Sequence, residues 1–479
     1  MSSSLDAIVI GSGPNGLTAA IVLAHQGCSV RLYEAGSTVG GGLRSGELLQ
    51  PKVIHDHCAT VQALAIVSPF LKTLPLANYG LEFAHPEAPF GHPFDDGTAV
   101  VVERSVEETA RSLGSDGKAY RALFDPLVAA TDNLMKAILH PLAFAHPFLL
   151  ARFAVNAIRS AAGLAKSRFS SERAHALLAG AAAHGLLPLS RLATAGFAMS
   201  LITVAHSVGW PVIRGGSQKL ADALAAHLRF LGGEIITNSR IDSLTQLPAA
   251  RAILCDITPR QLISIAGDKL PINYLRKLRN YRYGPGVFKM DFVLRDPVPW
   301  RSSDCTRVGS VHLGGTLAEV ADSERAAYEG RLHERPYVLA VQPSCFDSTR
   351  APSGVHTFWA YCHVPNGCAI DRSDAIERQI ERFAPGFRDC VLARRAMSPA
   401  DLEKNNANLI GGDIGGGANT LEQWFTRPVA RFDPYSTPVS DLYICSSSTP
   451  PGLGVHGMCG FYAAQSALRN SLANRKHKL

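Results

Sequence analysis

The sequence contains none of the short cysteine and histidine spacings that hold zinc, which excludes the common small metal-binding modules. Its ten cysteines never form Cys-x-x-Cys, a pattern that indicates reduced, mostly buried thiols. An excess of one charge is also lacking, since 47 Lys and Arg stand against 40 Asp and Glu. The resulting net charge of +7 is too small to indicate a nucleic-acid-binding protein. We therefore expect no bound metal and no nucleic-acid partner.

A secretory leader is missing too, because the chain opens with MSSSLD directly before a predicted strand. We therefore expect a cytoplasmic protein. Residues 192–213 carry no Asp, Glu, Lys or Arg, and their length would suffice to span a bilayer. They contain Gly209 and Pro211 and lead into a probable strand, so the pattern favours a buried core helix over a membrane span.

Residues 148–166 offer a second possible membrane contact. Arg152, Arg159 and Lys166 recur every seven residues, which predicts one polar stripe on an otherwise apolar helix. Such a helix could be buried in a substrate-binding domain. It could also lie on a membrane surface, where basic groups meet lipid phosphates. Both alternatives stay open, and we expect possible peripheral membrane association.

The stretch AIVIGSGPNGLTAAIVLAHQGCSVRLYEAG combines an apolar run, a glycine cluster, a second apolar run and an acid. It predicts a strand over 6–11, a helix over 14–27 and a strand over 29–34. This order is the βαβ unit that binds a dinucleotide. Further strands are predicted over 286–294, 336–344 and 356–364, and further helices over 119–207, in pieces, and over 374–392.

Three glycines explain how this unit would hold a pyrophosphate. Gly11 permits the tight turn, Gly13 lets the backbone approach the phosphates, and Gly16 lets helix and strand pack closely. The helix N-terminus then offers free N–H groups to the anion. Glu34 follows the second strand, where a carboxylate accepts hydrogen bonds from ribose hydroxyls, and an acid there disfavours NADP.

Two further glycine-rich stretches indicate FAD rather than NAD. GGGLRS follows Glu34 closely, and a glycine doublet in this place recurs in flavoproteins of the glutathione-reductase type. STPPGLGVHGM, near the C-terminus, places backbone amides before a helix, where they could face the anionic edge of a reduced flavin. A third stretch, residues 411–420, lacks the G-x-G-x-x-G spacing, so we expect a loop there and no second nucleotide site.

These motifs, with HDHCA, GWPVIRGGSQKLADAL, YGPGVFKMDFVL and CSSSTPPGLGVHGMCGFYAA, resemble the phytoene desaturase-like FAD-dependent oxidoreductases. The chain looks most similar to the bacterial relatives of pyridine nucleotide-disulphide oxidoreductase domain-containing protein two. The resemblance implies an α/β fold in which a Rossmann-type FAD-binding domain of the glutathione-reductase type is interleaved with a mixed-sheet and helical substrate domain. The FAD domain is expected from 1–75, 208–270 and 425–479, and the substrate domain from 76–207 and 271–424.

The same motifs yield a set of residues predicted to bind FAD. Ile241 is included because it matches the family position whose backbone meets adenine. Arg44 is included as well. Many relatives place an Arg directly after the glycine doublet, whereas in this chain Arg44 does not follow the doublet directly. The predicted FAD-binding residues are Gly11, Gly13, Pro14, Asn15, Gly16, Glu34, Ala35, Gly41, Gly42, Arg44, Ile241, Gly454, Val455, His456, Gly457 and Met458.

Two residues are candidates for catalysis. Lys289 lies in GVFKMDF, which resembles the strand of flavin amine oxidases whose lysine holds a water against flavin N5. The alternative is an exposed strand lysine paired with Asp291 on the same face. His456 lies in the turn expected to face the flavin. Other histidines in apolar surroundings are better explained as core residues, namely His184, His206, His312 and His363.

We therefore predict an FAD-dependent oxidoreductase that transfers hydride between flavin N5 and a lipophilic substrate. An isoprenoid, polyene or lipid-like chain would be desaturated, saturated or isomerised. One alternative is a flavin amine or amino-acid oxidase, which would need an aromatic cage or a carboxylate-binding Arg beside the flavin, and the sequence identifies neither. Trp359 and Tyr361 alternate on one predicted strand and could either wall a substrate pocket or pack in the core. Another is a flavin-stabilised interaction module with vestigial redox activity.

Overall fold

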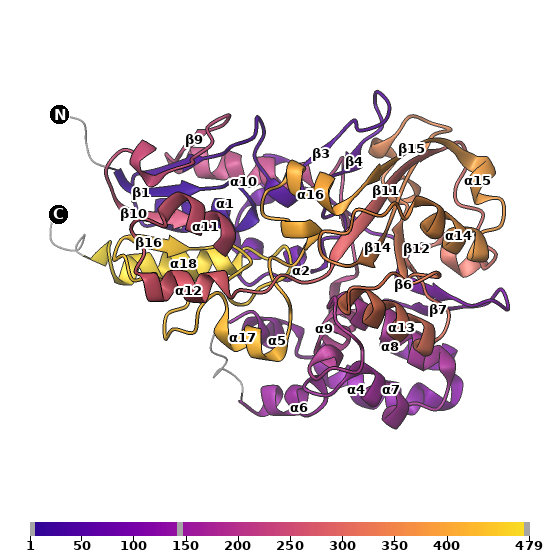
Figure 1. Cartoon of the computed structure of the whole chain (residues 1–479). Helices are drawn as coiled ribbons and strands as arrows, with labels where there is room; N and C mark the ends of the chain where they lie inside the picture. The colour runs from indigo at the N-terminus through magenta and orange to yellow at the C-terminus, as the bar shows by residue number, and fades with distance from the viewer. Residues whose placement is uncertain (1–4, 141–146, 474–479) are drawn as a thin grey trace.

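Two sheets organise the part of the chain that the computed structural model describes, residues 5–140 and 147–473 (Figure 1). The first sheet is parallel, with strand order β16-β10-β1-β2-β9. Its strands come from three distant stretches of the chain. They are β1 (Leu5–Ile10), β2 (Val30–Tyr33), β9 (Glu234–Ile236), β10 (Ala250–Cys255) and β16 (Leu442–Ile444).

Helices cover both faces of this first sheet. Along β1, Ala7 and Val9 pack with α1, α10 and α18, whereas Ile8 and Ile10 pack with α11 and α12. A parallel strand buried on both faces is apolar at nearly every position, which explains the continuous apolar run over residues 7–10 in β1. The covering helices are α1 (Pro14–His25), α10 (Gln218–Phe230), α11 (Pro259–Ala266), α12 (Ile272–Arg279) and α18 (Met458–Arg469).

The second sheet is mixed, with order β15-β11-β14-β13-β12-β6-β7. All of its neighbouring strands are antiparallel except β12 and β6, which pair in parallel. The strands are β6 (Ala88–Pro93), β7 (Ala99–Val102), β11 (Gly286–Leu294), β12 (Val308–Leu313), β13 (Val338–Val341), β14 (His356–Val364) and β15 (Val391–Met397).

A group of helices packs on one face of the second sheet and encloses the largest apolar core (Figure 1). These helices are α3 (Val106–Ser112), α4 (Gly117–Val128), α5 (Thr131–Ile138), α6 (Pro147–Ala157), α7 (Ala161–Arg168), α8 (Glu172–Ala183), α9 (Thr194–Val208) and α13 (Leu317–Tyr328). α14 (Ser373–Phe383) packs on the other face through Ile376 and Ile380.

Short elements connect the two parts. They are β3 (Ser45–Gly46), β4 (His55–Asp56), β5 (Phe83–Ala84), β8 (Val212–Ile213), α2 (Ala63–Ile66), α15 (Phe387–Cys390), α16 (Pro399–Asn405) and α17 (Leu421–Thr426). The hairpin β3–β4 carries the chain from the glycine doublet towards the second sheet.

The predicted α/β fold with a Rossmann-type domain and a mixed-sheet partner is confirmed. All strands of the first sheet fall within 1–75, 208–270 and 425–479, and all strands of the second fall in the remaining segments. α12 packs on the first sheet although it follows residue 270. The predicted helix over 374–392 is interrupted around Pro385, because proline disfavours a helical residue before it.

The single polar-striped helix predicted over 148–166 is wrong. The chain forms α6 and α7, bent by 92° to each other, because Ser160 starts a new helix by accepting a hydrogen bond from the Gly163 amide. Residues 192–213 form the mostly buried α9 and then β8, as the core-helix alternative expects. Across the described ranges no single helix is long and apolar enough to cross a bilayer.

Candidate active site

A cavity of about 1260 Å³ runs along the carboxyl edge of the first sheet and on towards the second. Its volume exceeds the ~300–1,000 Å³ of a typical site for one small ligand. Lining residues follow β1, β2, β10 and β16, and others come from 58–64 and 404–414. Ligands of open α/β sheets bind at this edge. The cavity therefore has the place for a dinucleotide and the room for a second molecule.

The loop between β1 and α1 forms one wall of this cavity. Gly11 has φ of +94°, and a Cβ at Gly16 would lie 2.0 Å from the carbonyl oxygen of Gly11. Both positions therefore require glycine. Gly13 precedes α1 without any side-chain cap; Pro14 has no N–H and the Gly16 amide is bound to Asp256, so Asn15 supplies the first-turn amide that a ligand can use.

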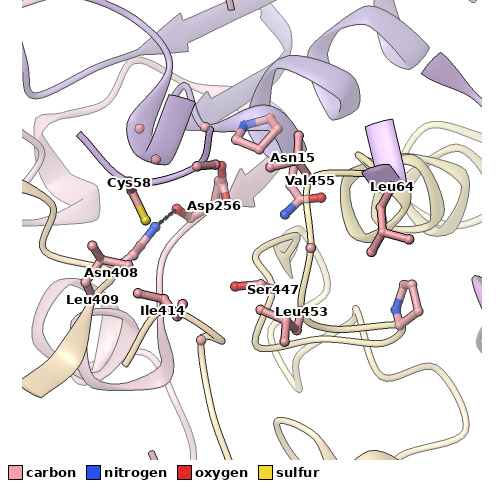
Figure 2. A pocket seen from close by; sticks show the side chains of 18 of the residues that line it. Asn15, Cys58, Leu64, Asp256, Asn408, Leu409, Ile414, Ser447, Leu453 and Val455 are labelled. Carbon is pink, nitrogen blue, oxygen red and sulfur yellow. Dashed lines mark hydrogen bonds between the residues drawn. The ribbon is translucent and has the colours of Figure 1, made fainter. Parts of the chain in front are cut away.

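Asp256, at the end of β10, lies directly against this loop. Its Oδ2 accepts a hydrogen bond from the Gly16 amide at 3.0 Å. The Asn408 side chain donates to the Asp256 carbonyl oxygen, as Figure 2 shows. Burial raises the pKa of Asp256 to about 7, and the nearby charge of Glu34 adds to the rise against the backbone hydrogen bonds. The carboxyl group is thus poised to be protonated beside a phosphate-binding loop.

Glu34 closes the other end of the loop. Its Oε2 accepts hydrogen bonds from the amide of Ser12 at 3.0 Å and from the Ser12 hydroxyl at 2.5 Å, and its Oε1 accepts from the Gly36 amide at 2.7 Å. Ile241 lines the same end of the cavity. These contacts orient the Glu34 carboxylate at the edge where a ribose would lie.

The opposite end of the cavity is formed by segments from both sheets. Figure 2 shows Ile414, Ser447 and Leu453 lining the part of the cavity that lies away from Asn15 and Asp256. Arg44 also lines the cavity; its Nε donates to the Gly41 carbonyl at 3.1 Å and its Nη2 to the Asn405 carbonyl. A planar ring held here would be contacted by both parts of the molecule.

Twelve of the sixteen residues predicted to bind FAD line the cavity. They are Gly11, Gly13, Pro14, Asn15, Glu34, Ala35, Gly41, Gly42, Arg44, Ile241, Gly454 and Val455. The other four lie behind its wall. Gly16 packs helix against strand, and Gly457 and Met458 begin α18 against α1, where a Cβ at Gly457 would lie 2.4 Å from Thr18 Oγ1.

His456 does not face the cavity. Its Nε2 lies 3.2 Å from the Gly452 carbonyl, and its Nδ1 accepts from the Met458 amide at 3.0 Å. Burial lowers the pKa of His456 to about 4. Both ring nitrogens therefore hold the turn before α18, which gives this residue a structural role in the arrangement seen here.

Lys289 is buried in β11 and also lies outside the lining. Its Nζ donates to Asp291 Oδ1 at 2.5 Å and to the Asp56 carbonyl at 3.0 Å, and it lies 5.8 Å from the ring centre of Trp359. Burial by itself would raise the pKa of Asp291, but Lys289 and His55 lower it overall. The lysine is thus paired with Asp291, as the alternative interpretation expects, although it is 2% exposed rather than a surface residue.

Arg350 completes this buried charge network between the two sheets. Its guanidinium donates to Asp56 at 2.9 Å, to Asp347 at 3.0 Å and to the Ile213 carbonyl at 3.0 Å, and all three side chains that carry charge are fully buried. Asp56 also accepts from Ser45. The network therefore pins the segment after the glycine doublet to both parts of the molecule.

The residues present fit FAD. Gly13 and Gly41 make a cradle that side chains would fill, since a Cβ at Gly13 would lie 2.6 Å from Asp256 Oδ2 and one at Gly41 would lie 3.1 Å from the Gly13 Cα. Asn15 borders the cavity, and its buried Oδ1 has no hydrogen-bond partner among the residues that the structure describes. The glycine loop, Glu34 and the Gly454–Val455 backbone would hold the pyrophosphate, ribose and flavin parts respectively.

Several lining residues were not predicted from the sequence. They are Cys58, Asp256, Asn408, Leu409, Ile414 and Ser447. Asp256 has a signal that could have revealed it, because it directly follows the apolar run that forms β10, at the carboxyl end of a parallel strand. The loop 411–420, predicted not to bind a second nucleotide, contributes Ile414 and Gly416 to the same cavity.

Comparisons with known proteins agree with this geometry. Residues 9–68 match the model of the NAD(P)-binding Rossmann-like domain. The chain is 26% identical to pyridine nucleotide-disulfide oxidoreductase domain-containing protein 2 of Mus musculus, over 97% of this chain and 93% of that protein. It is 21% identical to 4,4'-diapolycopen-4-al dehydrogenase of Metabacillus indicus, over 93% of each chain. It is 25% identical to a lycopene-forming phytoene desaturase of Pantoea ananas, over 56% of this chain and 58% of that protein.

Solved structures share the fold. An oxidoreductase of Methanosarcina mazei superposes with a TM-score of 0.65 at 14% identity, covering 97% of this chain and all of that one. Putrescine oxidase superposes with a TM-score of 0.62 at 16% identity, covering 98% of this chain and 99% of that one. The predicted resemblance to the phytoene desaturase-like proteins is thus confirmed, and so are the predictions of an oxidoreductase and of FAD as its cofactor.

Proposed function

We propose that this FAD-dependent oxidoreductase transfers hydride to or from a lipophilic isoprenoid, polyene or lipid-like substrate. One observation carries the proposal. Beyond the dinucleotide end, the cavity is walled mainly by apolar side chains of α6, α9, α17 and β14, and none of the described residues lining this half is Asp, Glu, Lys or Arg. The main apolar residues are Leu150, Phe153, Ile158, Phe197, Leu201, Leu339, Trp359, Trp424 and Phe425.

An apolar wall suits this chemistry in two ways. Each Å² of apolar ligand surface that it removes from water contributes about 25 cal/mol, so a long hydrocarbon is bound without ionic contacts. Water is excluded from the reacting carbon, which protects a hydride in transit. Bound FAD supplies the two-electron acceptor or donor, and the chain positions the hydrocarbon against it.

Two exposed phenylalanines beside the apolar half support delivery of the substrate from a membrane surface. Phe148 on α6 is 91% exposed and Phe425 on α17 is 80% exposed, and both helices contribute lining residues to the cavity. Exposed apolar side chains beside a binding site indicate contact with an apolar partner. We propose that these side chains touch the lipid while the hydrocarbon enters between the two helices.

Liposome flotation tests this membrane contact. Holoprotein mixed with vesicles of phosphatidylcholine and phosphatidylglycerol is expected to float with the lipid, and the double change Phe148→Ser and Phe425→Ser is expected to abolish flotation. Phe230→Ser is the control. Phe230 is also highly exposed, at 76%, but it lies on α10, the helix that packs on the first sheet. Recovery of the unchanged protein wholly in the soluble fraction would contradict the contact.

The arrangement of Trp359 and Tyr361 weighs against an amine oxidase. Both rings border the cavity, but they stack on each other with centres 5.5 Å apart and planes 9° apart. Sandwiching an amine between two rings needs about 7 Å, twice a van der Waals contact of about 3.5 Å. The pair therefore forms a flat wall and leaves no slot for an amine.

Anaerobic spectroscopy of the FAD-loaded protein tests the substrate class. Phytoene in vesicles is expected to bleach oxidised flavin or to recolour reduced flavin, and putrescine is expected to do neither. Phe197→Asp, which places a charge in the apolar wall, is expected to stop the change while FAD stays bound; Phe230→Asp is the control. Bleaching by putrescine alone would favour the amine oxidase. A flavin that neither photoreduces nor reoxidises would favour an interaction module.

A further inference from the structure

Three histidines, one partly buried and two fully buried, lead from the wall of the cavity into the second part of the molecule. His184, at the end of α8, lines the cavity, and its Nε2 lies 3.2 Å from Nε2 of His312 on β12. His92 on β6 lies on the far side of His312, and its Nε2 lies 2.6 Å from the Gly315 carbonyl oxygen. The inner two rings are fully buried.

The Gly315 carbonyl determines which nitrogen of His92 carries the hydrogen. A carbonyl oxygen only accepts, so His92 Nε2 must donate. Burial lowers the pKa of His92 to about 4 and that of His184 to about 3, so the rings are neutral and each holds one N–H. His92 Nδ1 is therefore an unprotonated acceptor.

The tautomer of His92 in turn determines the tautomers of His312 and of His184, which lines the cavity. A Cβ at Gly180 would lie 2.7 Å from His312 Nδ1 and 3.0 Å from His92 Nδ1, so the two nitrogens border the same small space. Neither has a hydrogen-bond partner among the described residues. Two lone pairs facing one space would repel each other, so His312 Nδ1 carries a hydrogen and its Nε2 accepts from His184. His184 Nδ1 is then an acceptor, and among the described residues only its Nε2 has a hydrogen-bond partner.

Ser310 supplies a second polar group at the same wall. It lies two residues before His312 on β12, and residues two apart in a strand share a face. Its side chain is 1% exposed, its Oγ has no partner among the described residues, and it lines the cavity. A buried hydroxyl without a partner costs binding or folding energy unless a ligand satisfies it.

We propose that His184 and Ser310 anchor a hydroxyl group, so that the ligand of the apolar half is a lipophilic alcohol. The alcohol O–H donates to His184 Nδ1, and its oxygen accepts from the Ser310 hydroxyl. An aldehyde can accept from Ser310 but leaves the His184 acceptor unmet, and a hydrocarbon satisfies neither group. This inference rests on the proposed lipophilic substrate and narrows it to a chemical class.

Binding of matched probes to the FAD-loaded protein tests the anchor without any variant. Geranylgeraniol is the alcohol and geranylgeranial the aldehyde, and the tryptophan fluorescence of the protein reports binding, because Trp210 packs edge-on against His184 with ring centres 5.3 Å apart. One hydrogen bond to a buried group changes the dissociation constant roughly tenfold. We expect the alcohol to bind about tenfold more tightly than the aldehyde.

Variants then assign the preference to the histidines. His184→Leu is expected to remove it, and His92→Phe to reduce it, because His312 is no longer held in one tautomer. His175→Leu, on the same helix but outside the cavity lining, is the control and should keep it. Equal binding of the two probes by the unchanged protein, or a preference that survives His184→Leu, would overturn the anchor. Failure of both probes to bind would instead overturn the proposed lipophilic substrate.

Discussion

Replacing Asp256 by Asn is expected to stabilise the protein at alkaline pH and to leave it nearly unchanged in acid. Asp256 is 5% exposed, and its Oδ2 accepts the Gly16 amide at 3.0 Å. Asn keeps an oxygen for this hydrogen bond and removes the charge. The comparison therefore isolates the cost of ionising one buried carboxyl group beside the glycine loop.

The magnitude follows from the pKa of about 7 in the folded protein, against 3.8 for an ordinary Asp. Between these values the folded state binds a proton that the unfolded state has released, so the free energy of unfolding falls as pH rises. Each pH unit in this window costs about 1.4 kcal/mol. The advantage of Asp256→Asn should therefore grow by about 3 kcal/mol from about pH 5 to about pH 8.

Bound FAD should increase the effect. A pyrophosphate at the first turn of α1 adds negative charge beside Asp256, and a like charge raises the pKa of a carboxyl further. FAD is therefore expected to bind more weakly to the unchanged protein as pH rises through about 7, and Asp256→Asn should flatten that dependence.

Urea denaturation at several pH values, with excess FAD present, measures the free energy directly. Asp268→Asn makes the same chemical change at an exposed position and serves as the control. If the difference in the free energy of unfolding between Asp256→Asn and the unchanged protein stays constant across the pH range, the reasoning is refuted. Such a result would mean that Asp256 does not exchange a proton between these pH values.

Two further changes test the site. Gly16→Ala is expected to yield protein without flavin absorbance after purification, because the new methyl group would lie 2.0 Å from the Gly11 carbonyl oxygen. Lys289→Met should lower the free energy of unfolding by about 3–5 kcal/mol, since Asp291 is left buried without its cation. Adding Asp291→Asn should recover most of that loss in the same denaturation assay. A Lys289→Met protein that reoxidises reduced FAD at the normal rate would remove this lysine from the redox step.

The dinucleotide half of the site could be predicted from the sequence because its signals are local. Gly11, Gly13 and Glu34 lie within one βαβ unit, and each has a physical reason to occupy its place. The parallel strand β1 is recognisable because burial on both faces makes the run over residues 7–10 apolar at every position. The presence of a dinucleotide-binding fold therefore follows from a few dozen residues, whereas the choice of FAD also needed the glycine-rich stretch near the C-terminus.

The rest of the site depends on contacts that no local pattern contains. Asp256 and Ser447 meet at the cavity only because β10 and β16 pair in the first sheet. His184 occurs in an apolar stretch and is expected to be a core histidine, yet the end of α8 brings it to the cavity wall. His456 occupies the expected turn, but its ring bonds inward to that turn. The spacing of residues in the sequence does not determine the direction in which a side chain points.

The prediction of one polar-striped helix from the regular basic spacing over 148–166 is wrong for a related reason. Arg152, Arg159 and Lys166 would share a face only if one helix ran through all of them. Ser160 starts a separate helix between the second and third of these residues, so the stripe is divided by a bend of 92°. A residue that can start a helix therefore predicts a helix boundary even where it lies inside a periodic pattern of charges.

The distance along the chain between the two halves of the FAD site has a consequence for biosynthesis. The wall formed by Ser447–Val455 follows β16, and α18 packs on α1 near the other end of the sequence. During translation the glycine loop leaves the ribosome first and must wait, exposed, for almost the entire polypeptide to follow. A nascent chain cannot enclose the flavin before its last strand and helix have emerged. A ribosome that stops before β16 and α18 have been made therefore releases a product in which the β10 edge of the first sheet is open.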